Sequence, residues 1–217
     1  MSEPVGRPER LVVVVGTATE VGKTWATCAA ATSARERGIA VAARKPVQSF
    51  DADASGAPLH PTDADLLAAA TGVAPYAVCP EHRWYPLAMA PPMAADALGR
   101  APLALDDIAG ELRWEPGTRL GFVETIGGVR SPLTHDADSA ALAHRLAPDL
   151  TILVADAELG TINATHLSVE ALRPLEVVVV LNRFDPAVDL HDRNRRWLVE
   201  RLGYRVVVDP IELLSGS

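Results

Sequence analysis

The chain has 217 residues, of which 48% are hydrophobic and 22% are charged, so it suits one globular domain with a sizeable core rather than a disordered chain. Its net charge of −8 argues against a nucleic-acid partner, because a phosphate backbone requires a basic surface. The two cysteines, Cys28 and Cys79, support neither a disulfide framework nor a zinc site, and no apolar run is long enough to span a membrane, so we expect a cytoplasmic protein without a membrane partner.

Predicted strands and helices alternate along residues 11–217, which we expect to form one domain behind a flexible tail of residues 1–10. Short apolar runs typical of buried parallel strands occupy residues 11–15, 40–43, 120–123, 151–155, 177–181 and 205–208. Helical segments lie between them at residues 23–37, 63–70, 106–112, 139–146, 164–172 and 191–202. This alternation predicts an α/β fold of three layers, with a mostly parallel central sheet flanked by helices.

A glycine-bounded turn joins the first strand to the first helix, and it reads Gly16-Thr17-Ala18-Thr19-Glu20-Val21-Gly22-Lys23-Thr24. Strand, turn and Gly-Lys-Thr at a helix start form the layout of a phosphate-binding loop, or P-loop, where main-chain N–H groups and the helix dipole favour an anion. Lys23 would contact the β- and γ-phosphates, and the Thr24 hydroxyl would hold Mg²⁺. Five residues rather than the usual four separate Gly16 from Gly22. A chance glycine turn is the alternative, but the preceding apolar strand favours a P-loop NTPase fold.

Polar residues follow several of the other predicted strands. Lys45, Glu124 and Asn182 each come shortly after a strand, and Asp156 and Glu158 come after another. Ligands bind at this edge of parallel α/β sheets. One charge at a strand end is usually just solvated, but several beside a phosphate-binding loop predict a second positive charge, a metal-binding carboxylate and a base-reading amide. Residues 73–92, rich in proline and aromatics, are expected to lie over the same edge.

From Leu11 to about Leu214, the chain resembles the dethiobiotin synthetase family. The family's loop reads Gly-Thr-Asp-Thr-Glu-Val-Gly-Lys-Thr, with the same five-residue spacing. Other matching segments are Lys45-Pro46-Val47 with Ser49, Thr62-Asp63-Ala64, Leu159-Gly160-Thr161-Ile162-Asn163, Asn182 and Asp209-Pro210-Ile211. Among the more specific of these is the segment at 159–163, which is similar to the family's Leu-Gly-x-Ile-Asn.

The resemblance implies an ATP-dependent cyclo-ligase that makes dethiobiotin from 7,8-diaminopelargonate and CO₂, with Mg²⁺ and with ATP as co-substrate. One amine would capture CO₂ as a carbamate, and the carbamate oxygen would attack the γ-phosphate to form a carbamic–phosphoric anhydride. The second amine would then displace phosphate and close the ring. Most of this catalysis is positioning and charge stabilisation. A homodimer is also implied, because in the family the loop that matches residues 160–163 comes from the partner subunit.

The resemblance also assigns roles to single residues. Lys45, Lys23 and Thr19 would be catalytic, with Lys45 between the carbamate and the γ-phosphate. Residues that would bind the nucleotide are Glu20, Val21, Gly22, Lys23, Thr24, Trp25, Asn182, Arg183, Pro210 and Ile211. Residues that would hold Mg²⁺ as hard oxygen donors are Thr24, Asp63 and Glu124. Residues that would contact the substrate are Thr19, Lys45, Ser49, Pro91, Gly127, Gly128, Gly160, Thr161, Ile162 and Asn163. The side chains of Trp25 and Cys28 are expected in the core of the first helix.

Each of these roles has a structural alternative. Asp63 could cap the helix that it begins, and Asp65 is a nearby alternative metal ligand. Lys45 could be a solvated loop lysine, Glu124 a solvated strand end, and Asn182 an ordinary turn residue. These alternatives stay open at the level of the sequence.

Three positions depart from the family pattern. Ala18 stands where the family usually has Asp, which removes a carboxylate close to the phosphates. Thr125 replaces a small residue after Glu124, and a β-branched residue does not tolerate a positive φ. Phe50 replaces a common Gly after Ser49 and could crowd the substrate entrance. A diverged paralogue that acts on another amine or carboxylate is therefore an alternative.

Two further functions are alternatives. A relative that amidates carboxylates would need a glutaminase domain, for which the chain is too short. A partitioning-type nucleotide-switch ATPase normally has a second lysine after the first glycine of its loop, where this chain has Thr17 and Ala18. A preference for ATP over GTP or CTP rests on the resemblance alone, since Asn182 with Asp185 also resembles part of a guanine-reading pattern.

Overall fold

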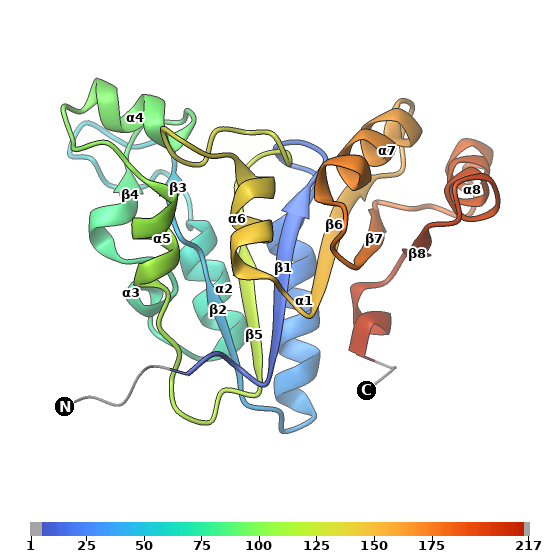
Figure 1. Cartoon of the computed structure of the whole chain (residues 1–217), viewed down its shortest axis with the longest axis horizontal. Helices are drawn as coiled ribbons and strands as arrows, with labels where there is room; N and C mark the ends of the chain where they lie inside the picture. Colours follow the sequence, from blue (N-terminus) through green and yellow to red (C-terminus); the bar gives the residue numbers. More distant parts are fainter. Residues whose placement is uncertain (1–5, 215–217) are drawn as a thin grey trace.

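The computed structural model describes residues 6–214, whose main sheet is parallel and has the strand order β2-β5-β1-β6-β7-β8 (Figure 1). Its strands are β1 (Arg10–Gly16), β2 (Val41–Arg44), β5 (Leu120–Glu124), β6 (Leu150–Asp156), β7 (Val177–Asn182) and β8 (Arg205–Val207). All six predicted strands are present. The predicted fold class, a three-layer α/β fold with a mostly parallel central sheet, is confirmed.

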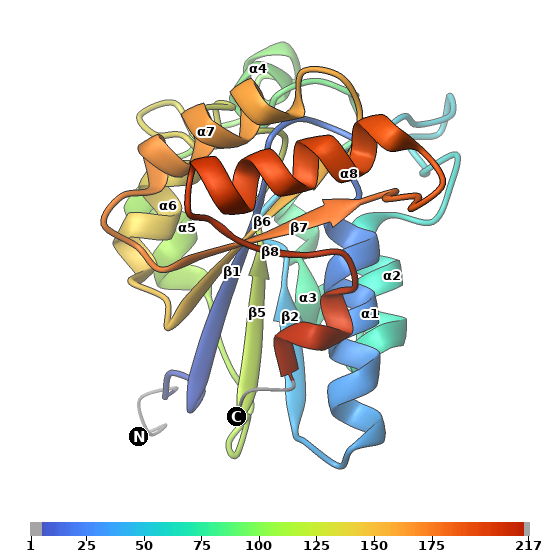
Figure 2. The same ribbon diagram turned by 90° about the vertical axis from the view of Figure 1, so that its right-hand side faces the viewer.

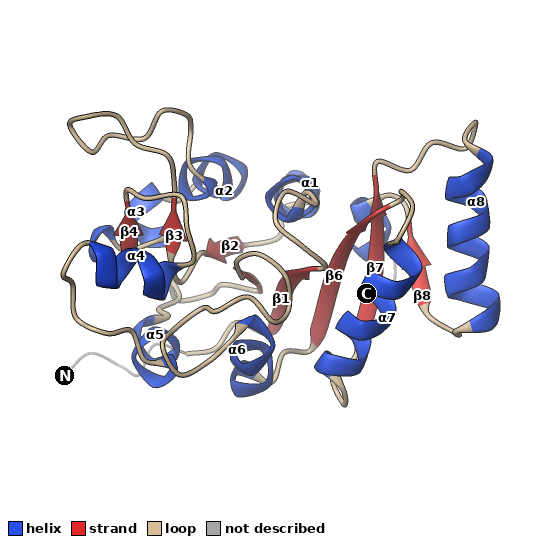
Figure 3. Ribbon diagram, turned by 90° about the horizontal axis from the view of Figure 1, so that it is seen from above, coloured by secondary structure: helices blue, strands red, loops and turns tan. Residues whose placement is uncertain are grey.

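Helices cover both faces of this sheet, as the view down onto the strand ends shows (Figure 3). The helices are α1 (Lys23–Glu36), α2 (Asp63–Thr71), α3 (Pro75–Val78), α4 (Pro91–Ala97), α5 (Leu105–Glu111), α6 (Ser139–Leu146), α7 (Thr161–Leu172) and α8 (Asp189–Arg196). The chain continues α8 as a π-helical segment, Trp197–Arg201, and a 3₁₀ helix covers Pro210–Leu214. α1, α2 and α3 lie on one face, and α5, α6 and α7 lie on the other.

The residues of β1 explain why its sequence is apolar without interruption. Val12 and Val14 pack into the core cluster with α1 and α2, whereas Val13 and Val15 pack into the cluster with α6 and α7. Side chains alternate between the faces of a strand, so a strand with helices on both sides needs apolar residues at every position. The same burial places the end of β1, and the loop that follows it, at the centre of one edge of the sheet.

Several local expectations need correction. The side chain of Trp25 is 52% exposed, so its predicted place in the core is wrong, and Cys28 beside it is half-buried. Helix α7 begins at Thr161 rather than at residue 164, because Gly160 takes a left-handed conformation and starts the helix there. Two short strands that the sequence did not predict, β3 (Gln48–Ser49) and β4 (Trp84–Tyr85), pair as a second small sheet.

The predicted tail is described only from residue 6 onward. Arg7 forms an ion pair with Asp149, and β1 begins at Arg10. Residues 1–5 and 215–217 lie outside the described part of the chain, so the division into a tail and one domain stays a prediction. Within residues 6–214, no helix combines the length and apolar character needed to cross a membrane.

Helix α2 starts at a complete capping box. The Thr62 side chain accepts a hydrogen bond from the Asp65 main-chain N–H, and the Asp65 carboxylate accepts one from the Thr62 N–H at 2.8 Å. Two N–H groups that the helix leaves unpaired are therefore satisfied. This cap fixes the first turn of α2, which carries Asp63.

We predict that Thr62→Ala lowers the free energy of unfolding by about 1 kcal/mol relative to Thr62→Ser, because only serine keeps the capping oxygen. Urea unfolding followed by circular dichroism measures the difference. Both variants lose the threonine methyl group, so Thr62→Ser is the matched control. Equal stability of the two variants would contradict a capping role for the hydroxyl.

Candidate active site

The loop between β1 and α1 has a backbone that requires its glycines. Gly22 has a φ of +96°, and a Cβ atom there would lie 2.1 Å from Nδ2 of Asn182. A Cβ atom on Gly16 would lie 2.9 Å from the Val21 side chain and 3.1 Å from the Gly127 carbonyl oxygen. A side chain at either position would collide with a neighbouring residue, which is why both positions are glycine.

Helix α1 begins directly after this loop and has no side-chain cap. The N–H groups of its first turn are therefore available to an external acceptor, and the helix dipole favours a negatively charged one. Lys23 is buried, and its ammonium group donates to the Ala18 carbonyl at 3.1 Å and to the Gly127 carbonyl at 2.9 Å. The lysine thus bridges its own loop and the loop after β5.

A cleft of about 1180 Å³ opens over this edge of the sheet. It is lined by Thr19, Glu20, Gly22, Lys23, Thr24, Lys45, Gln48, Ser49, Phe50, Asp51, Asp63, Ala88, Met89, Ala90, Pro91, Ile126, Gly127, Ser131, Pro132 and Arg183. Most of these residues lie on the loops that follow β1, β2, β5 and β7 and on the loops around β3 and β4. Part of the segment 73–92 lies over the strand ends as expected, since residues 88–91 belong to the lining.

The Lys45 side chain joins two carboxylates at the floor of the cleft. Its Nζ lies 2.7 Å from Oδ2 of Asp63 and 2.8 Å from Oε1 of Glu124, and it also donates to the Thr125 carbonyl at 3.1 Å. Lys45 is 2% exposed and Glu124 is fully buried. The alternative readings of Lys45 as a solvated loop residue and of Glu124 as a solvated strand end are therefore wrong.

These contacts shift the proton affinities of the groups. Burial disfavours the charged form of Lys45, but the carboxylates of Asp63 and Glu124 outweigh it and raise the pKa of Lys45 above its usual range. The charge of Lys45 in turn lowers the pKa of Asp63. Burial, together with the charge of Lys45, lowers the pKa of Lys23 to about 8. The floor of the cleft thus holds two close positive groups, of which only Lys45 has carboxylate partners in direct contact.

Thr24 places a hydroxyl between the same two carboxylates. Its Oγ1 lies 2.8 Å from Oδ1 of Asp63 and 2.9 Å from Oε1 of Glu124. A hydroxyl has one proton, so it can donate to only one of these oxygens at a time. Three hard oxygen donors therefore converge where Mg²⁺ could be held, and this ion usually takes one or two carboxylates together with substrate phosphates and water. The donor set fits Mg²⁺.

The structure also answers the alternatives for Asp63 and Asp65. Thr62, not Asp63, is the N-cap of α2, and Asp65 completes the capping box. Asp63 lines the cleft and contacts both Lys45 and Thr24, whereas Asp65 does not belong to the lining. The Asp63 carboxylate thus has no capping role, whereas the Asp65 carboxylate is part of the cap of α2.

The structure shows the surroundings of the three positions that depart from the family pattern. Lys23 contacts the main-chain oxygen of Ala18, and this contact does not depend on the side chain at that position. Thr125 is not among the residues with a positive φ; that conformation falls on Gly127, with a φ of +49°. Phe50 lines the cleft and packs edge-on against Trp84, with the ring centroids 5.9 Å apart.

Asn182 and Arg183 hold the phosphate-binding loop from the end of β7. Asn182 donates to the Val21 carbonyl at 2.9 Å, and Arg183 donates to the Glu20 carbonyl at 2.7 Å. Asn182 is buried, so it is not an ordinary exposed turn residue, and only Arg183 lines the cleft.

Other predicted residues do not line this cleft: Val21, Trp25, Glu124, Gly128, Gly160, Thr161, Ile162, Asn163, Asn182, Pro210 and Ile211. Gly160 and the three residues after it form the start of α7, next to the highly exposed Leu159. Pro210 and Ile211 begin the 3₁₀ helix that packs against α1. The structure thus gathers the phosphate-binding loop, the two lysines and the two carboxylates, and it leaves the start of α7 and the late 3₁₀ helix outside the cleft lining.

Sequence reasoning missed residues that support this cluster. The Thr27 hydroxyl lies 3.0 Å from Oε2 of Glu124, one helical turn after Lys23. Gln48 lines the cleft and accepts a hydrogen bond from the Ala64 N–H in the first turn of α2. Ser131 accepts one from the Gly128 N–H. In the sequence, Thr27, Gln48 and Ser131 stand out only because they are near Lys23, Ser49 and Gly128 along the chain. Closeness along the chain does not identify a contact.

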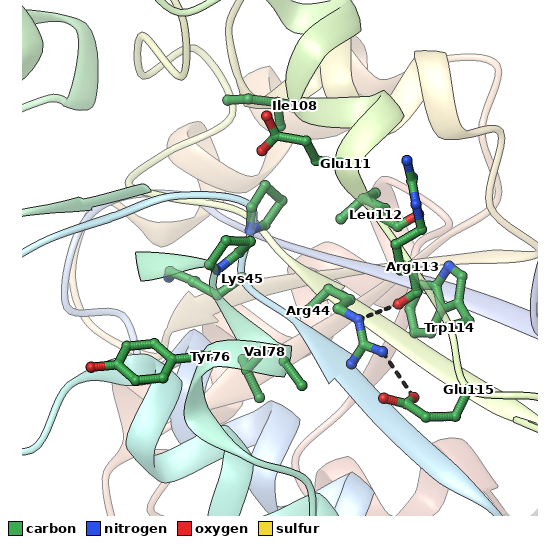
Figure 4. Close-up of a pocket in the computed structure, with 13 residues that line it drawn as sticks. Arg44, Lys45, Tyr76, Val78, Ile108, Glu111, Leu112, Arg113, Trp114 and Glu115 are labelled. Carbon is green, nitrogen blue, oxygen red and sulfur yellow. Dashed lines mark hydrogen bonds and ion pairs between the residues drawn. The ribbon is translucent and has the colours of Figure 1, made fainter. Parts of the chain in front are cut away.

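A second cavity, of about 280 Å³, lies behind the segment that carries Lys45 (Figure 4). Arg44 lies along one side of it, bonded to the Arg113 carbonyl and to the Glu115 carboxylate and stacked over the Trp114 ring. Glu111 on another side is paired with Arg83. Because these buried or half-buried charges already have partners, the cavity offers apolar surface rather than an open polar group.

The chain matches a family model described as an AAA domain over residues 10–214. The ATP-dependent dethiobiotin synthetase BioD of an Anaeromyxobacter species is 39% identical over 188 residues, which cover 82% of this chain and 81% of that protein. The protein of the same name from Anaeromyxobacter dehalogenans is 37% identical, with 94% of this chain and 89% of that protein covered. The one from Haloferax mediterranei is 38% identical, with 91% and 82% covered.

Among solved structures, the signal recognition particle receptor FtsY from Elizabethkingia anophelis aligns with a TM-score of 0.51 at 13% identity, and covers 93% of this chain and 58% of that one. At this identity the likeness supports the fold alone. The sequence relatives are 37–39% identical and span most of both chains. The phosphate-binding loop, Lys45 and Asp63 line one cleft, and Glu124 contacts Lys45 from below it. The chain belongs to the ATP-dependent dethiobiotin synthetase family of ligases.

Proposed function

We propose that the chain catalyses the ATP- and Mg²⁺-dependent carboxylation and ring closure of 7,8-diaminopelargonate with CO₂ to give dethiobiotin. The observation that carries this proposal is the buried Lys45, held by Asp63 and Glu124 in the same cleft as Lys23 and the uncapped start of α1. Membership of the family supports the same reaction.

The phosphate side of the reaction follows from the groups at the start of α1. Lys23 and the main-chain N–H groups there would bind the β- and γ-phosphates of ATP. Thr24, Asp63 and Glu124 would hold Mg²⁺, which when bound neutralises phosphate charge. Lys45 has a fixed position and a raised pKa, so it stays charged and stabilises negative charge as it develops.

The acceptor side would use the other part of the cleft. One substrate amine takes up CO₂ and loses a proton to become a carbamate, whose oxygen attacks the γ-phosphorus while ADP leaves. The second amine then attacks the carbamoyl carbon, and phosphate leaves as the ring closes. Thr19 and Ser49 would orient these groups, and Pro91 with Gly127 would bound the substrate, since all four line the cleft.

We also propose a homodimer in which Gly160–Asn163 of a neighbouring copy receives the substrate carboxylate. Residues 160–163 do not line the cleft of their own chain, and α7 begins without a side-chain cap. Open N–H groups at a helix start favour a carboxylate. The 86% exposed Leu159 beside them gives a neighbouring copy an apolar contact.

We predict that purified protein with 7,8-diaminopelargonate, bicarbonate and MgATP forms dethiobiotin, detected by mass spectrometry.

Lys45→Met should lower kcat about 100-fold or more while ATP binding persists, because the lost charge acts on the transition state. Lys23→Ala should lose ATP binding itself. Thermal melting of both variants controls for folding, since Asp63 and Glu124 lose their positively charged partner in Lys45→Met. Phosphate release from ATP without a diamine would overturn the proposal in favour of a nucleotide-switch ATPase.

We predict that Asp63→Asn raises the Mg²⁺ concentration for half-maximal activity by roughly 10-fold or more, because a metal-binding charge is lost. Asp65→Asn is the matched control on the same helix turn, since it affects the capping box and not the cleft. It should change the melting temperature and leave the Mg²⁺ requirement unchanged. A similar Mg²⁺ shift in both variants would assign the effect to the helix rather than to a metal ligand.

A further inference from the structure

Helix α8 sends two buried polar side chains towards the sheet, His191 and Asn194, which are 4% and 6% exposed. Figure 2 shows α8 on the near side of the sheet, running beside β7 and β8. Polar side chains at this burial normally have hydrogen-bond partners that require them. The reaction outlined above uses neither residue, so their partners indicate what they do.

One partner lies on the loop after β7. The main-chain N–H of Asp185 donates to Nδ1 of His191 at 3.0 Å, and the Phe184 ring lies against the imidazole with the centroids 6.1 Å apart. Because Nδ1 accepts this hydrogen bond, the neutral imidazole carries its proton on Nε2. The same loop begins with Asn182 and Arg183, which hold the carbonyls of the phosphate-binding loop.

The other partners lie on the loop after β6. Nε2 of His191 lies 3.4 Å from Oε1 of Glu158, so its proton faces a carboxylate. Asn194 donates from Nδ2 to the Ala157 carbonyl at 2.9 Å and to the Glu158 carbonyl at 3.2 Å. This loop leads through Gly160 directly into α7.

The two loops leave the sheet side by side, since Asp156 at the end of β6 pairs with Asn182 at the end of β7. One nitrogen of the His191 ring contacts each loop. A hydrophobic residue could fill the same space if packing were the only need, so the two opposed contacts point to a link between the loops.

We propose that His191, supported by Asn194, is a positioning residue that couples the nucleotide-side loop, residues 182–185, to the carboxylate-side loop, residues 157–160. The coupling rests on the proposed function, which places ATP at the first loop and the substrate carboxylate at the start of α7. A ligand that orders one loop orders the other through the imidazole, so each ligand tightens the binding of the other. In the proposed homodimer, this linkage runs from the nucleotide of one copy to the substrate in its neighbour's cleft.

Isothermal titration calorimetry tests this with the full chain, Mg²⁺ and a non-hydrolysable ATP analogue, with and without saturating 7,8-diaminopelargonate. We expect the diamino acid to tighten the binding of the analogue about 5-fold in the wild type. His191→Asn keeps an acceptor near the Asp185 N–H and has no group at the Nε2 position. Its coupling ratio should fall to about 1, with each ligand alone bound within about 2-fold of wild type. A purely structural role would not produce this split.

His166→Asn is the matched control, because His166 is an exposed histidine of α7 whose contact is the Tyr204 hydroxyl. It should leave the coupling ratio unchanged. Glu158→Ala is a second variant that removes an exposed carboxylate with little risk to folding, and it should also abolish the coupling. Combining it with His191→Asn should add nothing further, as a double-mutant cycle requires for two residues that act as one link.

An unchanged coupling ratio in His191→Asn and in Glu158→Ala, with both ligands still bound, would overturn the coupling alone. Failure of the wild type to bind the diamino acid or the ATP analogue would overturn the proposed function, and the coupling with it. A wild-type ratio near 1 with both ligands bound would overturn the coupling and leave the proposed function standing.

Discussion

A charged amine that is buried away from solvent needs close anionic partners. At Lys45 this requirement holds three separate segments of the chain together. The end of β2 supplies the ammonium group, the first turn of α2 supplies Asp63, and the end of β5 supplies Glu124. Removing one member of such a buried pair leaves an uncompensated charge, which is costly, whereas the intact pair adds little net stability. The cluster is thus better explained by the placement of its charges than by a gain in stability.

The phosphate-binding loop depends on the same cluster. Thr24 of α1 contacts both carboxylates, Thr27 contacts Glu124 one turn later, and Lys23 contacts the loop after β5 through Gly127. The first helix, which would receive the phosphates, and the lysine that would face the carbamate are therefore positioned by shared partners. A change at Glu124 would be felt at both.

Much of this arrangement was predictable because it follows from local patterns. The six strands appear as apolar runs since helices bury both faces of the sheet, and the loop from Gly16 to Thr24 has a fixed spacing. Lys45 and Glu124 were found because parallel strands end at one edge. The contact between them joins residues 79 positions apart, and no local pattern encodes its distance.

The features that the sequence analysis missed or predicted wrongly also have physical causes. The strands β3 and β4 have two residues each, too short to show a period, and they exist because the segments pair with each other. Trp25 looked like a core residue by composition, but the face of α1 that carries it does not meet the sheet. Thr125 looked incompatible with its loop only on the assumption that its position needed a positive φ, which Gly127 provides instead.

The division between residues that line the cleft and residues that do not is itself informative. Lys23, Thr24, Lys45 and Asp63 meet without help from another chain, whereas the start of α7 lies apart and carries the exposed Leu159. An isolated exposed leucine is ordinary. Leu159, however, lies beside the start of α7, which has no side-chain cap, so an apolar surface and main-chain N–H groups that favour an anion lie next to each other. The phosphoryl-transfer half of the reaction would thus be built within one chain, and the recognition of the substrate's far end would depend on a second copy. His191 contacts the loop after β7 and the loop that leads into α7, so in our proposal its buried polar contacts connect the nucleotide side of the site with the start of α7.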